Sequence, residues 1–167
     1  MKVIIIRGLP GTGKTIVSKI LEKIFVNSKV ICMDKFKIQA MKKEGCFEES
    51  EEIAYKKTLE KLNSFYKQNK KEIIIEGLII DGGFYNKLRD FINKTKSKAS
   101  WFRLLRPLEK LLEIDVGRKR KMKNSKEDFD RLKEGIENCK IEDEHLIKND
   151  NLALTIRKIL EKINQKT

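Results

Sequence analysis

The sequence runs from an apolar stretch, Val3-Ile4-Ile5-Ile6, into Gly8-Leu9-Pro10-Gly11-Thr12-Gly13-Lys14-Thr15. The apolar stretch is rich in β-branched residues and is typical of a buried strand. The second stretch fits G-x-x-x-x-G-K-[ST], in which glycines let backbone N–H groups curl around phosphate oxygens. Apolar residues at helical spacing follow at Ile16, Ile20, Leu21 and Ile24. A strand, a glycine-rich loop and a helix in this order predict a site for the phosphates of a nucleoside triphosphate.

The loop residues divide the expected contacts among them. Lys14 would reach the β and γ phosphates, and the hydroxyl of Thr15 would be a ligand of Mg²⁺. The helix that begins near Lys14 directs the positive end of its dipole at the same anion. The alternative is a glycine-rich turn that only connects a strand to a helix, but here the lysine and threonine also fall in register. The residues expected to contact the nucleotide are Gly8, Gly11, Thr12, Gly13, Lys14 and Thr15.

Length and composition bound the remaining possibilities. We expect the 167 residues to form a single domain. No apolar run is long enough to span a membrane, and the first one is too short for a signal peptide, so we expect a cytoplasmic protein without membrane association. The cysteines, Cys32, Cys46 and Cys139, are odd in number and lack C-x-x-C spacing. We therefore expect free thiols, with Cys32 buried in a strand.

The chain carries 38 lysines and arginines against 25 acidic residues, a formal net charge of +13. Such a charge favours association with polyanions through phosphate contacts, so nucleic acid is a possible partner. Because lysines occur throughout the chain, a solvated surface is the alternative explanation. One concentrated basic segment, residues 118–123, stands apart from this background.

Short apolar runs alternate with longer amphipathic stretches, which predicts an α/β fold with a parallel sheet covered on both faces. In the longest helix, expected over residues 48–68, Tyr55, Leu59, Leu62 and Tyr66 share one apolar face and are expected in the core. Strands are expected near residues 3–6, 29–33, 72–76, 100–105 and 144–148. The other helices are expected near residues 84–92, from Pro107 onward, over 126–140 and over 151–164.

Ligands of open parallel sheets bind outside the carboxyl ends of the strands, so residues that follow strands are the candidates for chemistry. Asp34 follows the second strand and is our candidate general base for a hydroxyl that receives a phosphoryl group. The alternative role for Asp34 is an N-cap of the next helix. Glu76 ends the third strand and is a candidate for holding Mg²⁺, directly or through water, unless it is an ordinary acid at a strand end.

Other polar residues are weaker candidates. Asp81, next to two glycines, would line the pocket of the acceptor or simply form a turn. Arg118 and Arg120 would reach the transferring phosphoryl group from a lid, unless they belong to a solvated basic helix end. Arg106 is a further residue within expected reach of phosphate. The triplet at residues 149–151 would offer polar edges to an adenine or form a turn and helix cap.

The phosphate loop, the sequence Asp34-Lys35-Phe36-Lys37, the acid at Glu76 and the basic segment at Arg118 resemble the small P-loop kinases of the zeta-toxin and polynucleotide-kinase type. The resemblance implies a three-layer P-loop NTPase fold with sheet order 2-3-1-4-5 and a small helical lid over residues 115–130. It implies Asp34 as the base, Lys37 as a basic neighbour of the acceptor or phosphate, and Arg118 or Arg120 as the lid arginine. Lys37 stands where many relatives carry arginine, and Glu76-Gly77 replaces an Asp-centred strand end.

The leading interpretation is an ATP- and Mg²⁺-dependent kinase that transfers the γ-phosphate to a hydroxyl of a small-molecule acceptor. One alternative is a kinase for the 5′-hydroxyl of polynucleotides, which the charge of +13 favours. Another is a nucleotide-binding ATPase or switch whose loops respond to the γ-phosphate. A kinase requires an open pocket beside Asp34, whereas a switch requires a partner surface. The sequence leaves open the acceptor, the choice of ATP over GTP and the oligomeric state.

Overall fold

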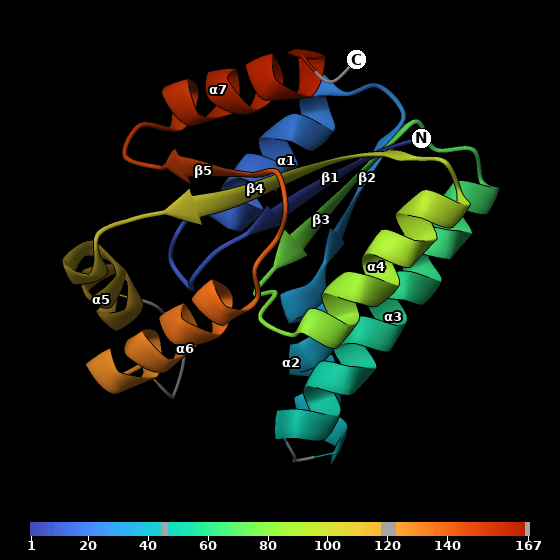
Figure 1. Ribbon diagram of the computed structural model, residues 1–167. Coiled ribbons are helices and arrows are strands. Elements are labelled where there is room, and N and C mark those ends of the chain that lie inside the picture. Colours follow the sequence, from blue (N-terminus) through green and yellow to red (C-terminus); the bar gives the residue numbers. More distant parts are fainter. Residues whose placement is uncertain (45–46, 118–122, 166–167) are drawn as a thin grey trace.

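The computed structural model describes residues 1–44, 47–117 and 123–165 (Figure 1). Arg118 and Arg120, the expected lid arginines, lie outside the described residues. The strands are β1 (Lys2–Arg7), β2 (Ser28–Cys32), β3 (Glu72–Gly77), β4 (Lys98–Leu105) and β5 (Glu144–Lys148). The helices are α1 (Lys14–Ile24), α2 (Met33–Glu44), α3 (Phe47–Lys67), α4 (Gly82–Lys94), α5 (Leu108–Val116), α6 (Lys126–Asn138) and α7 (Leu152–Gln165).

The five strands form one parallel sheet in the order β2-β3-β1-β4-β5, which confirms the predicted order. Strand β1 lies in the middle, and its residues 3–6 are at most 1% exposed. A central parallel strand is buried on both faces, so the side chains between its two ends, residues 3–6, are all apolar. This burial explains the uninterrupted run of valine and isoleucine at residues 3–6.

Helices cover both faces of the sheet (Figure 1). On one face, α3 and α4 pack Leu62, Phe84 and Leu88 against alternate residues of the central strands, such as Val3 and Ile5. On the other face, α1 and α7 pack against the residues between them, with Val17, Leu21 and Ile159 beside Ile4 and Ile6. The alternation follows from the strand pleat, which sends successive side chains to opposite faces. The chain is therefore a three-layer α/β structure.

The predicted elements are present, with small differences in their bounds. Strand β5 spans the predicted residues, and β4 begins earlier than predicted, at Lys98. Helix α2 begins at Met33, so Asp34 lies in the first helical turn and not at the N-cap. Within the described residues, no helix combines the length and apolar character that a membrane crossing requires.

The prediction that Tyr66 lies in the core was wrong. Tyr66 is 39% exposed, whereas its neighbour Phe65 is 7% exposed and belongs to the core. Buried positions recur along α3 at helical spacing and include Ala54, Thr58, Leu62 and Phe65. Phe65, and not Tyr66, therefore continues the buried face in the last turn of α3, and Tyr66 contacts Phe91 of α4 edge to face.

A buried ion pair connects the middle of the sheet to its edge strand. Arg7, at the end of β1 and 1% exposed, binds both carboxylate oxygens of Glu144 at the start of β5, with Nη2 2.9 Å from Oε2. Nη1 of Arg7 also donates to the carbonyl oxygen of Ile79, just beyond β3. Arg103 of β4 places its Nε 3.3 Å from Glu144. One guanidinium thus ties β1, β5 and the segment after β3 together.

We expect Arg7→Met to lower the free energy of unfolding by about 3–5 kcal/mol, because it leaves Glu144 buried with one partner fewer. The double variant Arg7→Met/Glu144→Met should lose less than the sum of the single variants. Urea denaturation followed by circular dichroism measures both. Arg157→Met, which breaks only the exposed pair with Glu161, is the control and should change stability by under about 0.5 kcal/mol. Additive losses would contradict the coupling.

Candidate functional site

The phosphate loop lies between β1 and α1 and places its glycines where larger residues do not fit. Gly13, the residue before α1, has φ +91°, a conformation that favours glycine. A Cβ atom at Gly13 would lie 2.5 Å from Nδ2 of Asn149, so the side chain of Asn149 also excludes any larger residue there. The glycine is required by both backbone conformation and close packing.

Two polar residues that follow β4 and β5 hold the loop in place. Asn149, which follows β5, donates from Nδ2 to the carbonyl oxygen of Thr12 and accepts from Thr155 of α7 at 2.9 Å. Arg106, which follows β4, donates to the carbonyl oxygens of Gly11 at 3.1 Å and of Asn149 at 2.8 Å. The loop conformation is thus fixed by β4, β5 and α7 in addition to its own glycines.

Sequence reasoning did not find the contact of Asn149 with the loop. The triplet at residues 149–151 suggested a turn and helix cap, and Asn151 does accept a hydrogen bond from the N–H of Leu154 in the first turn of α7. The position of Asn149 directly after a strand was the available signal. Its partner lies 137 residues away, so only the strand order brings the two together.

Lys14 and Thr15 occupy the end of the loop. Nζ of Lys14 donates to the carbonyl oxygens of Gly8 at 2.9 Å and of Leu9 at 3.2 Å, and the residue is 6% exposed. Thr15 donates its hydroxyl to Oε1 of Glu76 at 3.0 Å. This contact brings together the two residues that the sequence suggested for a metal ion.

Glu76 is fully buried at the end of β3, and its second carboxylate oxygen, Oε2, has no hydrogen-bond partner in the described structure. Burying an unpaired carboxylate oxygen is costly, so this position is suited to a cation or to water bound to a cation. Mg²⁺ commonly uses one or two protein carboxylates and completes its shell with water and phosphate oxygens. Glu76 and Thr15 therefore fit the ligand set expected for Mg²⁺ beside a phosphate loop.

Asp34 lies at the carboxyl end of β2, in the first turn of α2. The preceding residue, Met33, packs against Gly77 so closely that a Cβ atom at Gly77 would lie 2.8 Å from its Cβ atom. Gly77 thus lets the start of α2 approach the end of β3, where Glu76 lies. This close approach gives a structural reason for the glycine that follows Glu76.

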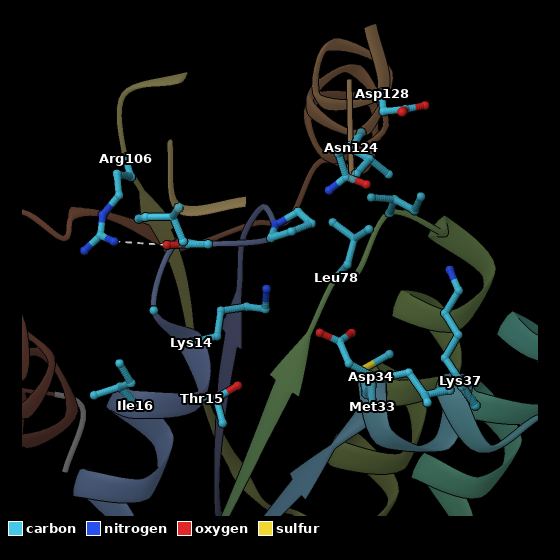
Figure 2. Close-up of a pocket in the computed structure, with 18 of the residues that line it drawn as sticks. Lys14, Thr15, Ile16, Met33, Asp34, Lys37, Leu78, Arg106, Asn124 and Asp128 are labelled. Carbon is cyan, nitrogen blue, oxygen red and sulfur yellow. Dashed lines mark hydrogen bonds between the residues drawn. The ribbon is translucent and has the colours of Figure 1, made fainter. Parts of the chain in front are cut away.

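A single cavity of about 1280 Å³ joins the phosphate loop to Asp34. In Figure 2, Lys14 extends from the loop, and Asp34 and Lys37 extend from α2 into the same region, with Asn124 and Asp128 on the opposite side. Lys37 forms an ion pair with Glu51 of α3. The cavity thus continues from the loop into a space between α2, α3 and α6.

The hydroxyl of Tyr55 of α3 is buried in the wall of this cavity and has no hydrogen-bond partner in the described structure. Burial, followed by the nearby carboxylates of Glu51 and Asp81, raises the pKa of the Tyr55 hydroxyl, so it stays protonated. Asp81, which the sequence suggested for the acceptor pocket, is not among the cavity-lining residues described. Its side chain accepts from the N–H of Phe84 as the N-cap of α4.

Comparison with solved structures places this arrangement among known folds. A gluconokinase from Sinorhizobium meliloti 1021 has a TM-score of 0.70 and 15% sequence identity to this chain. The match covers 98% of this chain and 92% of the gluconokinase chain. The tunicamycin resistance protein of Deinococcus radiodurans has a TM-score of 0.70 and 17% sequence identity. The match covers 97% of this chain and 95% of the resistance protein. A chain of the Pnkp1/Rnl/Hen1 RNA repair complex has a TM-score of 0.61 and 18% sequence identity. The match covers 83% of this chain and 44% of that chain.

The chain shares with these solved structures the predicted three-layer α/β fold, with a five-stranded parallel sheet of order 2-3-1-4-5. The resemblance that the sequence suggested is therefore confirmed at the level of the fold. No protein-family model matches the sequence, and no curated protein matches it significantly. At identities of 15–18%, these solved structures show only that the architecture is shared.

The thiol of Cys32 lies at the end of β2, opposite Glu76 in the register of the sheet. Burial and then the Glu76 carboxylate raise its pKa from 9.0 to about 12. Because the folded pKa lies above the unfolded value, protonated Cys32 contributes stability below about pH 9, and this contribution is lost as the pH rises toward 12.

We expect iodoacetamide at pH 8 to alkylate Cys32 at least about 100-fold more slowly in the folded protein than in urea, because only the thiolate reacts. Peptide mass spectrometry separates Cys32 from the other cysteines. Glu76→Gln should speed the reaction in the folded state, because it removes a negative charge beside the thiol. Equal rates in folded and unfolded protein would contradict the raised pKa.

Proposed function

We propose that the protein is an ATP- and Mg²⁺-dependent kinase that transfers the γ-phosphate to a hydroxyl of a small molecule. The observation that carries the proposal is the single cavity that contains both the phosphate loop with Lys14 and the carboxylate of Asp34. A kinase needs these two groups on opposite sides of the reacting atoms. The fold, shared with a gluconokinase and a tunicamycin resistance protein, supports the proposal.

In the proposed reaction, Asp34 orients the acceptor hydroxyl and takes its proton as the new oxygen–phosphorus bond forms. The bond between the γ-phosphorus and the bridging oxygen breaks, and ADP carries that oxygen away. Lys14 leaves the carbonyl oxygens of Gly8 and Leu9 and places its ammonium on the β and γ phosphates, while the loop N–H groups hold their oxygens. Asn149 and Arg106 keep the loop in the binding conformation.

Thr15 and Glu76 would hold Mg²⁺, which neutralises phosphate charge and orients the oxygens of the transferred group. The unpaired Oε2 of Glu76 supports this assignment, because a metal-bound water would satisfy it. Glutamate is longer than the usual aspartate and suits such a water-mediated contact. Thr15 would exchange its present hydrogen bond with Glu76 for the metal.

The size and lining of the cavity support a small acceptor over water. Its volume exceeds the usual 300–1,000 Å³ or so of a single ligand site and leaves room for two substrates. The walls beyond Asp34 are largely apolar, with Ile38, Leu78 and Leu132 among them. The unpaired hydroxyl of Tyr55 would hydrogen-bond a polar group of the acceptor. An ATPase or switch would not need this second space.

The charges in the acceptor half of the cavity favour an acceptor with little negative charge. Lys37 is paired with Glu51, and Arg131 is paired with Asp128. A polyanionic acceptor would have to break these pairs to gain cationic partners.

A second candidate is the 5′-hydroxyl of a polynucleotide. The structural similarity to a chain of an RNA repair complex and the net charge of +13 favour it. An acceptor panel separates the two candidates.

We expect Asp34→Asn to reduce phosphoryl transfer by a factor of about 100 to 10,000, as for loss of a general base, while ATP affinity changes by less than about threefold. Transfer of labelled γ-phosphate would be tested against nucleosides, RNA and DNA with 5′-hydroxyl ends, sugars, amino-sugar antibiotics and hydroxyamino acids. Asp90→Asn, an exposed change on α4, is the matched control and should retain full activity. Undiminished transfer by Asp34→Asn would remove Asp34 from the mechanism.

We expect Asn149→Ala to weaken binding of ATP with Mg²⁺ by roughly three- to tenfold, because the loop must then be ordered at the expense of binding free energy. Isothermal titration calorimetry measures this affinity. Asn151→Ala is the matched control, because it removes the cap of α7 without touching the loop and should leave affinity within about twofold. Equal losses in both variants would mean that general destabilisation, not the contact with Thr12, sets the affinity.

A further inference from the structure

A second hollow, of about 500 Å³, lies at the amino ends of the strands, at the opposite end of the sheet from the phosphate loop. Its walls come from the starts of β1, β3 and β4 and from the turns that follow α3 and α4. We call it the basic hollow, because the charged residues in its lining are Lys2, Lys70, Lys71, Lys96 and Lys98, with Glu72.

The strand register of the sheet brings two of these lysines together. The parallel register places Lys2 of β1 directly beside Lys98 of β4, with Glu72 on its other side. Like charges on neighbouring strands are unfavourable to folding unless a counter-charge relieves them. Lys71 and Lys96 extend the positive surface, and both are exposed. The positive charge of this surface is therefore concentrated at one end of the sheet.

The residue at position 96 is not the one that the backbone prefers. Lys96 has φ +50° at the end of α4, where the N–H of Ser97 bonds back to the carbonyl oxygen of Ile92. Such a helix end favours glycine or asparagine, and the equivalent position at the end of α3 is Asn69, with φ +54°. A lysine there strains the backbone and adds a charge to the basic hollow.

An aromatic ring lines the same hollow. Tyr66 is exposed at the end of α3, and its ring is supported edge to face by Phe91 at 6.1 Å between centroids. Lysines that track phosphates, together with an exposed aromatic ring on which a base can stack, are the two features of surfaces that bind single-stranded nucleic acid. Neither a free phosphate nor an acidic lipid headgroup would need the ring.

We propose that the basic hollow binds a single-stranded segment of nucleic acid, with its phosphates on the lysines and a base stacked on Tyr66. The hollow and Asp34 lie at opposite ends of the sheet. The bound strand is therefore a partner of the protein and not the acceptor of the proposed phosphoryl transfer. The inference does not depend on the proposed kinase activity.

The test is fluorescence anisotropy with labelled RNA and DNA 12-mers of mixed sequence, from about 20 to 200 mM salt. The triple variant Lys71→Gln/Lys96→Asn/Lys98→Gln should bind at least about tenfold more weakly at low salt. Its slope of log affinity against log salt should be shallower by about 2, since each phosphate contact with a single strand contributes about 0.7. Lys96→Asn suits the backbone at that position, so this variant alone should unfold at no lower a temperature than the parent.

The matched control is the triple variant Lys56→Gln/Lys87→Gln/Lys158→Gln, which removes the same charge from exposed helix positions outside both hollows. It should bind within about threefold of the parent. Tyr66→Leu, which can still pack on Phe91, should weaken binding by roughly five- to tenfold without changing the salt slope.

Three outcomes would overturn the proposal. The first is that the parent binds no oligonucleotide at low salt. The second is that both triple variants lose affinity equally, which would indicate an effect of total charge alone. The third is that vesicles with phosphatidylserine bind through the same lysines while oligonucleotides do not. Asp34→Asn should bind the oligonucleotides as tightly as the parent, so failure of the proposed kinase activity would leave this result unaffected.

Discussion

The structure depends on the polar contacts that hold the phosphate loop from outside. A loop that turns its backbone N–H groups toward a ligand cannot use them for its own hydrogen bonds, so its conformation must be fixed by other contacts. Asn149 and Arg106 supply them through the carbonyl oxygens of Thr12 and Gly11. These residues follow β5 and β4, so the loop is correctly shaped only when the edge of the sheet is assembled.

The same edge is held by the buried ion pair of Arg7 and Glu144. Arg7 lies at the end of β1, immediately before the loop, and Glu144 opens β5, the strand that leads to Asn149. The ion pair thus fixes the strand whose far end holds the loop. A charged pair in the core is costly to desolvate, and its hydrogen bonds to both carboxylate oxygens and to Ile79 offset that cost.

The two ends of the sheet carry different chemistry. At the carboxyl ends, Lys37 of α2 pairs with Glu51 of α3, Arg131 pairs with Asp128 within α6, and apolar side chains form much of the cavity wall. At the amino ends, lysines cluster around an exposed tyrosine. The net charge of +13 that the sequence shows is therefore not a property of the proposed acceptor site. The net charge is a poor guide to the substrate, because it does not show where in the structure the charged residues lie.

The fold class, the phosphate loop and the candidate residues that follow strands could be predicted from the amino-acid sequence, because buried strands and glycine-rich loops leave local patterns. Asp34 and Lys37 were predicted beside the loop, and both line its cavity. Only the folded chain shows that Asn149 holds the loop and that Tyr66 lies beside the lysines. These arrangements bring together residues from distant parts of the chain, and no local pattern records them.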